Sequence, residues 1–303
     1  MKNKIIIIAG PTASGKTDLA IKVAKMLDTE IISCDSMQIY KKMNIGTAKA
    51  TIDEMQGVKH HLIDIVEPNQ EYSVSDYQKA AIKIIDNLHS NGKIPVICGG
   101  TGLYIDSLLY PLSMGAKDDS IREKLENELK QYGPGFMHDK LKAIDPIEAE
   151  KVHENNTKRV IRALEIYEIT GQIKSNQEDR KKELLYDTLL ICLSPNREEL
   201  YNKINKRVDI MFEKGLIDEV KKLIYEDKYD FSMQSMQAIG YKEFSEYLSN
   251  NIPEEELKEM IKTNSRHYAK RQITWFKRYE FAKFYENNLD ENILIDIKKF
   301  IEE

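Results

Sequence analysis

Residues 5–17, Ile-Ile-Ile-Ile-Ala-Gly-Pro-Thr-Ala-Ser-Gly-Lys-Thr, place an apolar run directly before a glycine-rich loop. The loop fits the pattern G-x-x-x-x-G-K-[ST], and apolar residues at helical spacing follow it from Leu19 to Leu27. A strand, a glycine-rich loop and a helix in this order direct backbone N–H groups, a helix N-terminus and one lysine at the same anion. The sequence therefore predicts a loop that binds a di- or triphosphate, as in nucleotide- and ATP-binding proteins, formed by Gly10, Pro11, Thr12, Ala13, Ser14, Gly15, Lys16 and Thr17.

Further short, β-branched runs predict more strands of the same sheet. They span Glu30–Cys34, Ile94–Cys98 and Thr188–Leu193. Stretches of helical period lie between them, for example Tyr77–Leu88, and this alternation is typical of a parallel sheet with crossover helices. We therefore expect an α/β fold with a P-loop NTPase-like parallel sheet, in which ligands bind at the carboxyl ends of the strands.

The pattern becomes helical from about Asp118 and returns to strand at Thr188. Helical segments around Glu148–Val152 and Thr157–Ile169 lie in this region, and Gly133-Pro134-Gly135 interrupts it as a helix breaker. We expect one α/β core that carries a helical insertion. The predicted divisions are residues 1–115 for the first part of the core, 116–185 for the inserted helical domain, and 186–303 for the second part with C-terminal helices.

Composition limits the cellular setting. The chain has 303 residues, a net charge of −5 and three widely separated cysteines, Cys34, Cys98 and Cys192. Their spacing indicates neither a disulfide framework nor a zinc site, and the N-terminal apolar run is too short to span a membrane. We expect a reduced, cytoplasmic protein with no membrane segment, and a monomer.

Two segments are rich in cations despite the negative net charge. They are Lys158–Arg162 and the run Arg266–Arg278, in which Tyr268, Trp275 and Phe276 are interleaved. Such a run can be a solvated helix face with its aromatic residues turned to the core, or a surface that faces RNA. The pattern alone leaves both interpretations open.

The residues at the predicted strand ends indicate the chemistry. Lys16 can pair with phosphate oxygens, and Thr17 can offer a hydroxyl to a phosphate-bound Mg²⁺. Asp35 ends the second strand; it could orient a metal in a nucleotide hydrolase or small-molecule kinase, or accept a proton from a nucleophile in a group transferase. Sequence spacing does not separate these roles.

The strand Ile94–Cys98 does not end in the acidic residue of a nucleotide-driven motor. It leads instead into Gly99-Gly100-Thr101-Gly102-Leu103-Tyr104. We interpret the glycines as positions where a substrate approaches the backbone, and Thr101 as a hydroxyl at the strand tip.

These motifs together resemble the tRNA dimethylallyltransferases, and in particular their shorter bacterial type. The matching segments occur in the family's order: the phosphate loop 10–17, Asp35-Ser36-Met37-Gln38 with Tyr40 and Gly46-Thr47-Ala48-Lys49, His60-His61-Leu62-Ile63-Asp64, Gly99–Tyr104, Arg159-Val160-Ile161-Arg162-Ala163-Leu164-Glu165, Gly215-Leu216-Ile217, Ala238-Ile239-Gly240-Tyr241-Lys242-Glu243, and Arg271-Gln272-Ile273-Thr274-Trp275-Phe276.

The resemblance implies a reaction. A dimethylallyl group passes from dimethylallyl diphosphate to N6 of adenine 37 in tRNAs that read codons beginning with U. The phosphate loop, Lys16 and Mg²⁺ then stabilise a departing diphosphate rather than a phosphoryl donor. By the same resemblance Asp35 is the base that accepts the amine proton, and Thr101 contacts the target nucleotide.

The resemblance also implies which residues meet the tRNA anticodon stem-loop. Beside Asp35 and Thr101 they are Ser36, Met37, Gln38, Arg122, Lys158, Arg159, Val160, Ile161 and Arg162. The helical insertion is expected to grip the anticodon stem while the adenine is taken out of its stack. His60 and His61 match a family motif, and we interpret them as a hydrogen-bonded structural pair.

Three other functions are compatible with a phosphate loop. A P-loop small-molecule kinase would use Asp35 to hold Mg²⁺ and the insertion as a lid. An adenylate prenyltransferase would modify free AMP or ATP. A non-catalytic RNA-binding protein would use the loop without chemistry.

Overall fold

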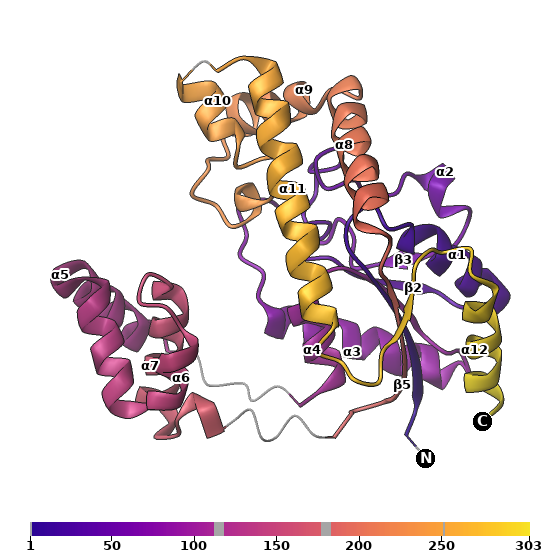
Figure 1. Cartoon of the computed structure of the whole chain (residues 1–303), viewed down its shortest axis with the longest axis horizontal. Helices are drawn as coiled ribbons and strands as arrows, with labels where there is room; N and C mark the ends of the chain where they lie inside the picture. The colour runs from indigo at the N-terminus through magenta and orange to yellow at the C-terminus, as the bar shows by residue number, and fades with distance from the viewer. Residues whose placement is uncertain (1, 112–117, 177–182, 251) are drawn as a thin grey trace. The chain divides into compact units, whose positions relative to one another are not determined.

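The computed structural model describes residues 2–111, 118–176, 183–250 and 252–303, which divide into two compact units (Figure 1). The core unit comprises Met1–Leu109 and Tyr186–Glu303. The helical unit comprises Tyr110–Leu185 and is inserted into the core unit. The predicted first boundary, between residues 115 and 116, lies outside the described residues, and the chain re-enters the core unit at Tyr186.

The core unit contains one six-stranded sheet in the order β3-β2-β4-β1-β5-β6, and every pair is parallel, which confirms the predicted fold class. The strands are β1 Lys4–Ala9, β2 Ile31–Cys34, β3 His60–His61, β4 Val96–Gly99, β5 Asp187–Leu193 and β6 Lys283–Tyr285. The sequence predicted four of them. The edge strands β3 and β6 were missed because they are only two and three residues long and none of their residues is fully buried.

The strands read as continuous apolar runs because both faces of the sheet are covered by helices. Residues Ile5 to Ala9 of β1 are completely buried. Helices α1 (Lys16–Met26) and α12 (Glu291–Glu302) cover one face, and α3 (Val74–Ser90) and α4 (Gly102–Leu109) lie on the other (Figure 1). This packing fixes the strand ends, where the loops after β1, β2 and β4 meet.

A second apolar cluster of the core unit lies among its remaining helices, apart from the short and exposed α2. It includes Tyr40 and Met43 from the first half of the chain and Tyr241, Phe244 and Ile261 from the second. The elements are α2 Ile52–Met55, α8 Arg197–Glu213, α9 Leu216–Lys221, a π-helical turn Lys222–Glu226, a 3₁₀ turn Ser235–Gln237, α10 Phe244–Asn250 and α11 Glu254–Phe276. Helix α11 packs along α8 and reaches α4, so its last turns come to the strand ends (Figure 1).

The helical unit consists of α5 (Asp119–Ile144), α6 (Pro146–Lys151) and α7 (Thr157–Thr170). The predicted breaker at residues 133–135 produces a kink within α5, where Gly133 adopts φ +83°, and Pro134 starts the second half. Gly171 ends α7 in the left-handed region with φ +67°. Throughout the described ranges, every helix is too short or too polar to cross a lipid bilayer.

Candidate active site

The phosphate loop leaves β1 and turns into α1 at Lys16. Gly15, with φ +84°, caps the helix, and Ala13 also lies in the left-handed region with φ +62°. A non-glycine residue holds this conformation only where the surroundings enforce it. Ala13 packs against a small apolar cluster formed by residues of α8 and α11, which includes Leu200 and Ile204. The loop is therefore held in one shape by the helices that follow in the second half of the chain.

Two cations converge on this loop. Lys16 Nζ donates to the Pro11 carbonyl over 3.2 Å, and an Nη atom of Arg207 on α8 donates to the Thr12 hydroxyl over 3.2 Å. Burial lowers the pKa of Lys16, and burial also lowers the pKa of Arg207. In the described part of the chain neither side chain forms an ion pair with a carboxylate. The loop thus carries positive charge that a polyphosphate could neutralise.

One polar group of the loop is left without a partner. Ser14 is 3% exposed, and among the described residues its hydroxyl makes no hydrogen bond. A buried hydroxyl without a partner is costly unless a ligand satisfies it. Together with the two cations, it fits a loop shaped for phosphate oxygens.

Asp35 follows β2 and turns back on its own backbone. Its Oδ1 atom accepts the N–H groups of Met37 and Gln38 over 2.9 and 3.3 Å. Within the described residues no hydrogen bond reaches the other oxygen, and the side chain is half-buried. The carboxylate is therefore held by one oxygen and can accept a proton on the other.

Thr101 brings the ends of β2 and β4 together. Its Oγ1 atom accepts the Ser36 N–H over 3.0 Å, and its own N–H donates to the Cys34 carbonyl over 3.1 Å. The phenol of Tyr268 on α11 lies near Thr101 and Asp35, and burial raises its pKa. The structure thus brings Asp35, Ser36 and Thr101 together as the motifs implied, and it adds Tyr268, which sequence analysis placed only in an aromatic and basic run.

Close packing against β2 and α11 accounts for the glycines at and after the end of β4. A Cβ at Gly99 would lie 2.1 Å from the Cys34 carbonyl oxygen, one at Gly100 would lie 2.2 Å from Gln272 Nε2, and one at Gly102 would lie 2.3 Å from the Trp275 ring. These contacts alone require glycine at the three positions, and the approach of a substrate to the backbone there stays a prediction. These glycines allow β2 and α11 to pack against the turn.

Gln272 is a buried polar residue that sequence analysis did not single out. Its Oε1 atom accepts the Thr12 N–H over 3.0 Å, and its Nε2 atom donates to the Gly100 carbonyl over 2.9 Å. The sequence contained a signal for it, because Ala269, Gln272 and Phe276 follow the helical spacing of a buried face of α11. A glutamine at a core position needs internal partners.

The residues predicted to meet tRNA in the helical unit differ in exposure. Lys158 and Arg159 are exposed on the first turn of α7. Val160 and Ile161 are 0% and 4% exposed and pack in the core of the unit, so their side chains are not on the surface beside Lys158 and Arg159. The sequence motif ran through both faces of an amphipathic helix.

Arg122 and Arg162 share one buried carboxylate. Arg162 donates to Glu165 Oε2 over 2.7 Å, while Arg122 pairs with Glu126 over 3.0 Å and lies 4.0 Å from the same Oε2 atom. Glu165 is completely buried. Both arginines are therefore fixed in place rather than free on the surface.

The run Arg266–Arg278 contains both residues turned to the interior and exposed cations. Arg266 is turned inward to Asn205 over 2.6 Å, and Arg278 stacks on Trp275 with its guanidinium 3.9 Å from the ring centroid. Lys270, Arg271, Lys277 and Arg278 of the same run are exposed.

The histidine pair has internal partners. His60 Nδ1 lies 2.9 Å from the Val58 carbonyl, and His61 Nε2 is paired with Glu30. Both side chains thus hold the edge of the sheet.

A parallel sheet with a phosphate loop after β1, and a carboxylate and a hydroxyl at the ends of the neighbouring strands, defines a P-loop α/β protein. Within that class the chain belongs to the IPP transferase family, whose model matches residues 38–279.

Relatives cover nearly the whole chain. It is 48% identical to a tRNA dimethylallyltransferase of Acetivibrio thermocellus, over 99% of this chain and 97% of the relative. It is 51% identical to a tRNA dimethylallyltransferase of Bacillus velezensis, over 91% and 90% of the two chains.

Solved structures agree in fold. The chain is similar to a tRNA isopentenylpyrophosphate transferase of Staphylococcus epidermidis, with a TM-score of 0.73, 42% identity and 99% of both chains covered. It is also similar to a eukaryotic dimethylallyltransferase acting on tRNA, with a TM-score of 0.84 and 31% identity over 99% of this chain and 80% of that one.

Proposed function

We propose that this protein transfers the dimethylallyl group of dimethylallyl diphosphate to N6 of adenine 37 in tRNAs that read codons beginning with U. The products are N6-(dimethylallyl)adenosine and diphosphate. The names of the relatives and of the structural neighbours support this function. The observation that carries it is the joint presence of a cationic phosphate loop and an Asp35–Thr101 pair at the ends of adjoining strands.

The phosphate loop would hold the leaving group. When the allylic C–O bond breaks, negative charge grows on the departing diphosphate. Lys16, Arg207 and the backbone N–H groups at the start of α1 lie where they can stabilise that charge. Gly10, Pro11, Thr12, Ala13, Ser14, Gly15 and Thr17 complete the proposed donor site.

The phosphate loop offers a Mg²⁺ ion few protein ligands, and Thr17 is the one proposed. Thr17 is half-buried on the first turn of α1, beside Lys16. The described residues contain no cluster of three or more histidine, cysteine or acidic side chains that could hold a metal. A magnesium ion would bind the Thr17 hydroxyl and the phosphate oxygens of the donor. When bound, it would neutralise charge on the diphosphate.

Asp35 would act as the general base. As the carbon–nitrogen bond forms, the N6 amine loses a proton, and the free oxygen of Asp35 can accept it. Thr101 holds the Ser36 N–H and so keeps the Asp35 turn in register with the end of β4. Ser36, Met37 and Gln38 lie on the same turn and would line the target nucleotide.

The helical unit would supply the grip on the anticodon stem-loop. Lys158 and Arg159 offer exposed charge to phosphates, and Arg122 and Arg162 offer guanidinium groups fixed by Glu165. Because an adenine inside its stack is out of reach, the base must be extruded toward Asp35. We propose a monomeric, cytoplasmic enzyme.

Labelled dimethylallyl diphosphate and an unmodified anticodon stem-loop test this function. We expect label in the RNA, at the adenine beside the anticodon. Label only in free AMP or ATP would indicate an adenylate prenyltransferase. Phosphate transfer from ATP without prenylation would indicate a kinase and would overturn the proposal.

A further inference from the structure

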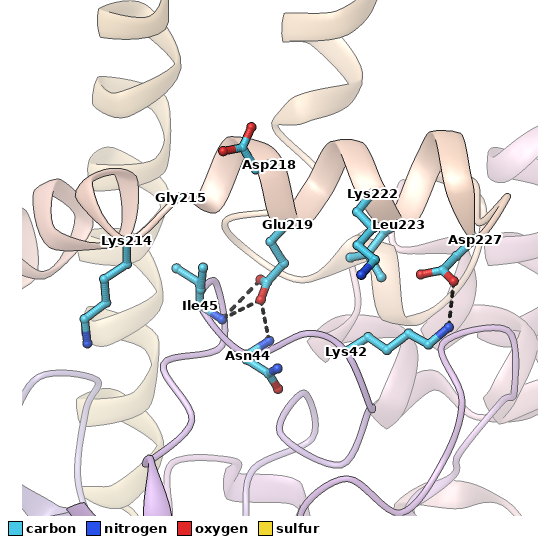
Figure 2. A pocket seen from close by; sticks show the side chains of 10 residues that line it. All are labelled: Lys42, Asn44, Ile45, Lys214, Gly215, Asp218, Glu219, Lys222, Leu223 and Asp227. Atoms are coloured by element: carbon cyan, nitrogen blue, oxygen red, sulfur yellow. Dashed lines mark hydrogen bonds and ion pairs between the residues drawn. The ribbon is translucent and has the colours of Figure 1, made fainter. Parts of the chain in front are cut away.

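A carboxylate from the second half of the chain fixes the loop that follows Asp35. Glu219 on α9 accepts the N–H groups of Asn44 over 2.9 Å, of Ile45 over 2.9 and 3.1 Å, and of Gly46 over 3.2 Å. Figure 2 shows this carboxylate pointing from the helix toward the loop, with its bonds to Asn44 and Ile45. Successive backbone N–H groups that face one anion form a strong anion-binding concavity.

Tyr241 completes the set of donors to Glu219. Its hydroxyl donates to Glu219 Oε1 over 2.6 Å, and its oxygen accepts the Gly46 N–H over 3.1 Å. A Cβ at Gly46 would lie 2.4 Å from the Tyr241 ring, so the loop backbone rests directly on that ring. Hydrogen bonds to an ionised acceptor are roughly twice as strong as neutral ones. The segment 44–46 is therefore held by charge as well as by packing.

The same loop holds a residue of the proposed active site. Gln38 Nε2 donates to the carbonyls of Thr47 and Ala48 over 3.2 and 3.4 Å. The Gln38 N–H in turn donates to Asp35 Oδ1 over 3.3 Å. A continuous series of contacts therefore connects Glu219, through residues 44–48 and Gln38, with the Asp35 carboxylate.

We propose that Glu219 is a positioning residue for the Asp35 turn, which rests on the proposed function. In this role it would contact neither donor nor RNA and would act by fixing the segment that carries the carbonyl partners of Gln38. Displacing a reacting group by about 1 Å can cost roughly 100-fold in rate. Lys16 and Arg207 make their hydrogen bonds to Pro11 and Thr12 of the phosphate loop and not to residues 44–48, so we expect donor affinity to be independent of Glu219.

Glu219→Gln provides the test, with Asp218→Asn as the matched control. Glutamine has nearly the same volume, but it removes the charge and turns an N–H₂ group toward backbone donors. Asp218 precedes Glu219 on α9, and both line one 630 Å³ cavity (Figure 2). The Asp218 side chain is exposed and has no hydrogen-bond partner within the described chain. The readouts are the single-turnover rate of prenyl transfer, the KM for the donor, and hydrogen exchange of residues 36–48 in the free protein.

We expect Glu219→Gln to lower the single-turnover rate by about 10- to 100-fold, to speed amide exchange at residues 36–48, and to leave the donor KM within about twofold. Asp218→Asn should match wild type. Tyr241→Phe, which keeps the carboxylate, should show a smaller loss and guards against a misfolded variant. An unchanged rate, or a loss confined to the donor KM, would overturn the inference. If wild type itself fails to prenylate RNA, the proposed function fails, whereas the exchange measurement still tests Glu219.

Discussion

The side-chain amide of Gln272, on helix α11, donates to the Gly100 carbonyl over 2.9 Å. Its other end accepts the N–H of Thr12 in the phosphate loop, 260 residues away in sequence. One buried amide therefore ties the loop after β1 to the turn after β4. The geometry of the proposed donor site depends on a residue outside both motifs.

Gln272→Ala should weaken the fold and the phosphate loop together. It leaves the Thr12 N–H and the Gly100 carbonyl without their partner, and an unsatisfied buried group costs about 1–3 kcal/mol. We expect a lower unfolding midpoint in urea and a weaker Kd for diphosphate by calorimetry. Lys270→Ala, an exposed change on the same helix, is the control. Equal diphosphate affinity in both variants would show that the tie does not shape the loop.

Donor binding should depend on pH through Lys16. Burial holds the pKa of the free ammonium below 10.5, and a bound diphosphate favours the charged form and raises that pKa. Affinity should therefore fall as pH rises from the lowered pKa of the free protein to the raised pKa of the complex. For the free fold the sign is opposite: the unfolded chain binds more protons in the window below 10.5, so this group adds stability as pH rises through its folded pKa.

Calorimetry of diphosphate binding across alkaline pH checks this dependence. Lys16→Arg is the control, because a guanidinium stays protonated throughout the range and its affinity should stay flat. Parallel profiles for wild type and Lys16→Arg would assign the dependence to another group.

The sequence predicted the central strands because parallel strands buried on both faces are nearly continuous apolar runs. β1, β2, β4 and β5 are of this kind. β3 and β6 exist only because a neighbouring strand offers a partner, which no local pattern contains. The phosphate loop was predictable for a similar reason, since all its residues are consecutive.

The rest of the site depends on contacts between distant segments. Arg207 meets Thr12 across 195 residues, and only the packing of α8 against the loop reveals it. The packing role of the glycines after β4 was not predicted because their neighbours, Cys34, Gln272 and Trp275, lie far away in sequence. Val160 and Ile161 were included because a motif does not distinguish the faces of a helix.

Gly102→Ala should destabilise the core unit through overpacking. The new Cβ would lie 2.3 Å from the Trp275 ring, against which the Arg278 guanidinium also stacks. Overpacking of this kind costs about 1–3 kcal/mol. Gly135→Ala is the matched control, because its Cβ would meet only Glu154 at 3.7 Å and alanine favours a helix. Urea unfolding followed by tryptophan fluorescence measures Gly102→Ala, since Trp275 is the sole tryptophan; far-ultraviolet circular dichroism measures Gly135→Ala. A midpoint unchanged in Gly102→Ala would contradict the packing argument.

Asp35→Asn should slow the chemical step and spare binding. The amide keeps an oxygen for the N–H groups of Met37 and Gln38 but cannot take a proton from the adenine amine. The loss of a general base costs about 10²- to 10⁴-fold in rate. Single-turnover prenyl transfer measures this loss, and filter binding of the stem-loop should change much less. A wild-type rate in Asp35→Asn would remove Asp35 as the base.

Arg159→Ala should weaken RNA binding in proportion to one phosphate contact. Arg159 is exposed on α7, in contrast to its buried neighbours Val160 and Ile161, so its charge is free to meet a phosphate. Removing one such contact lowers the slope of log affinity against log salt by about 1. Binding of the stem-loop at several salt concentrations measures the slope. Lys142→Ala removes an equal charge from the end of α5 and controls for net charge. If both variants change the slope equally, the helical unit attracts RNA by its overall charge and α7 makes no defined phosphate contact.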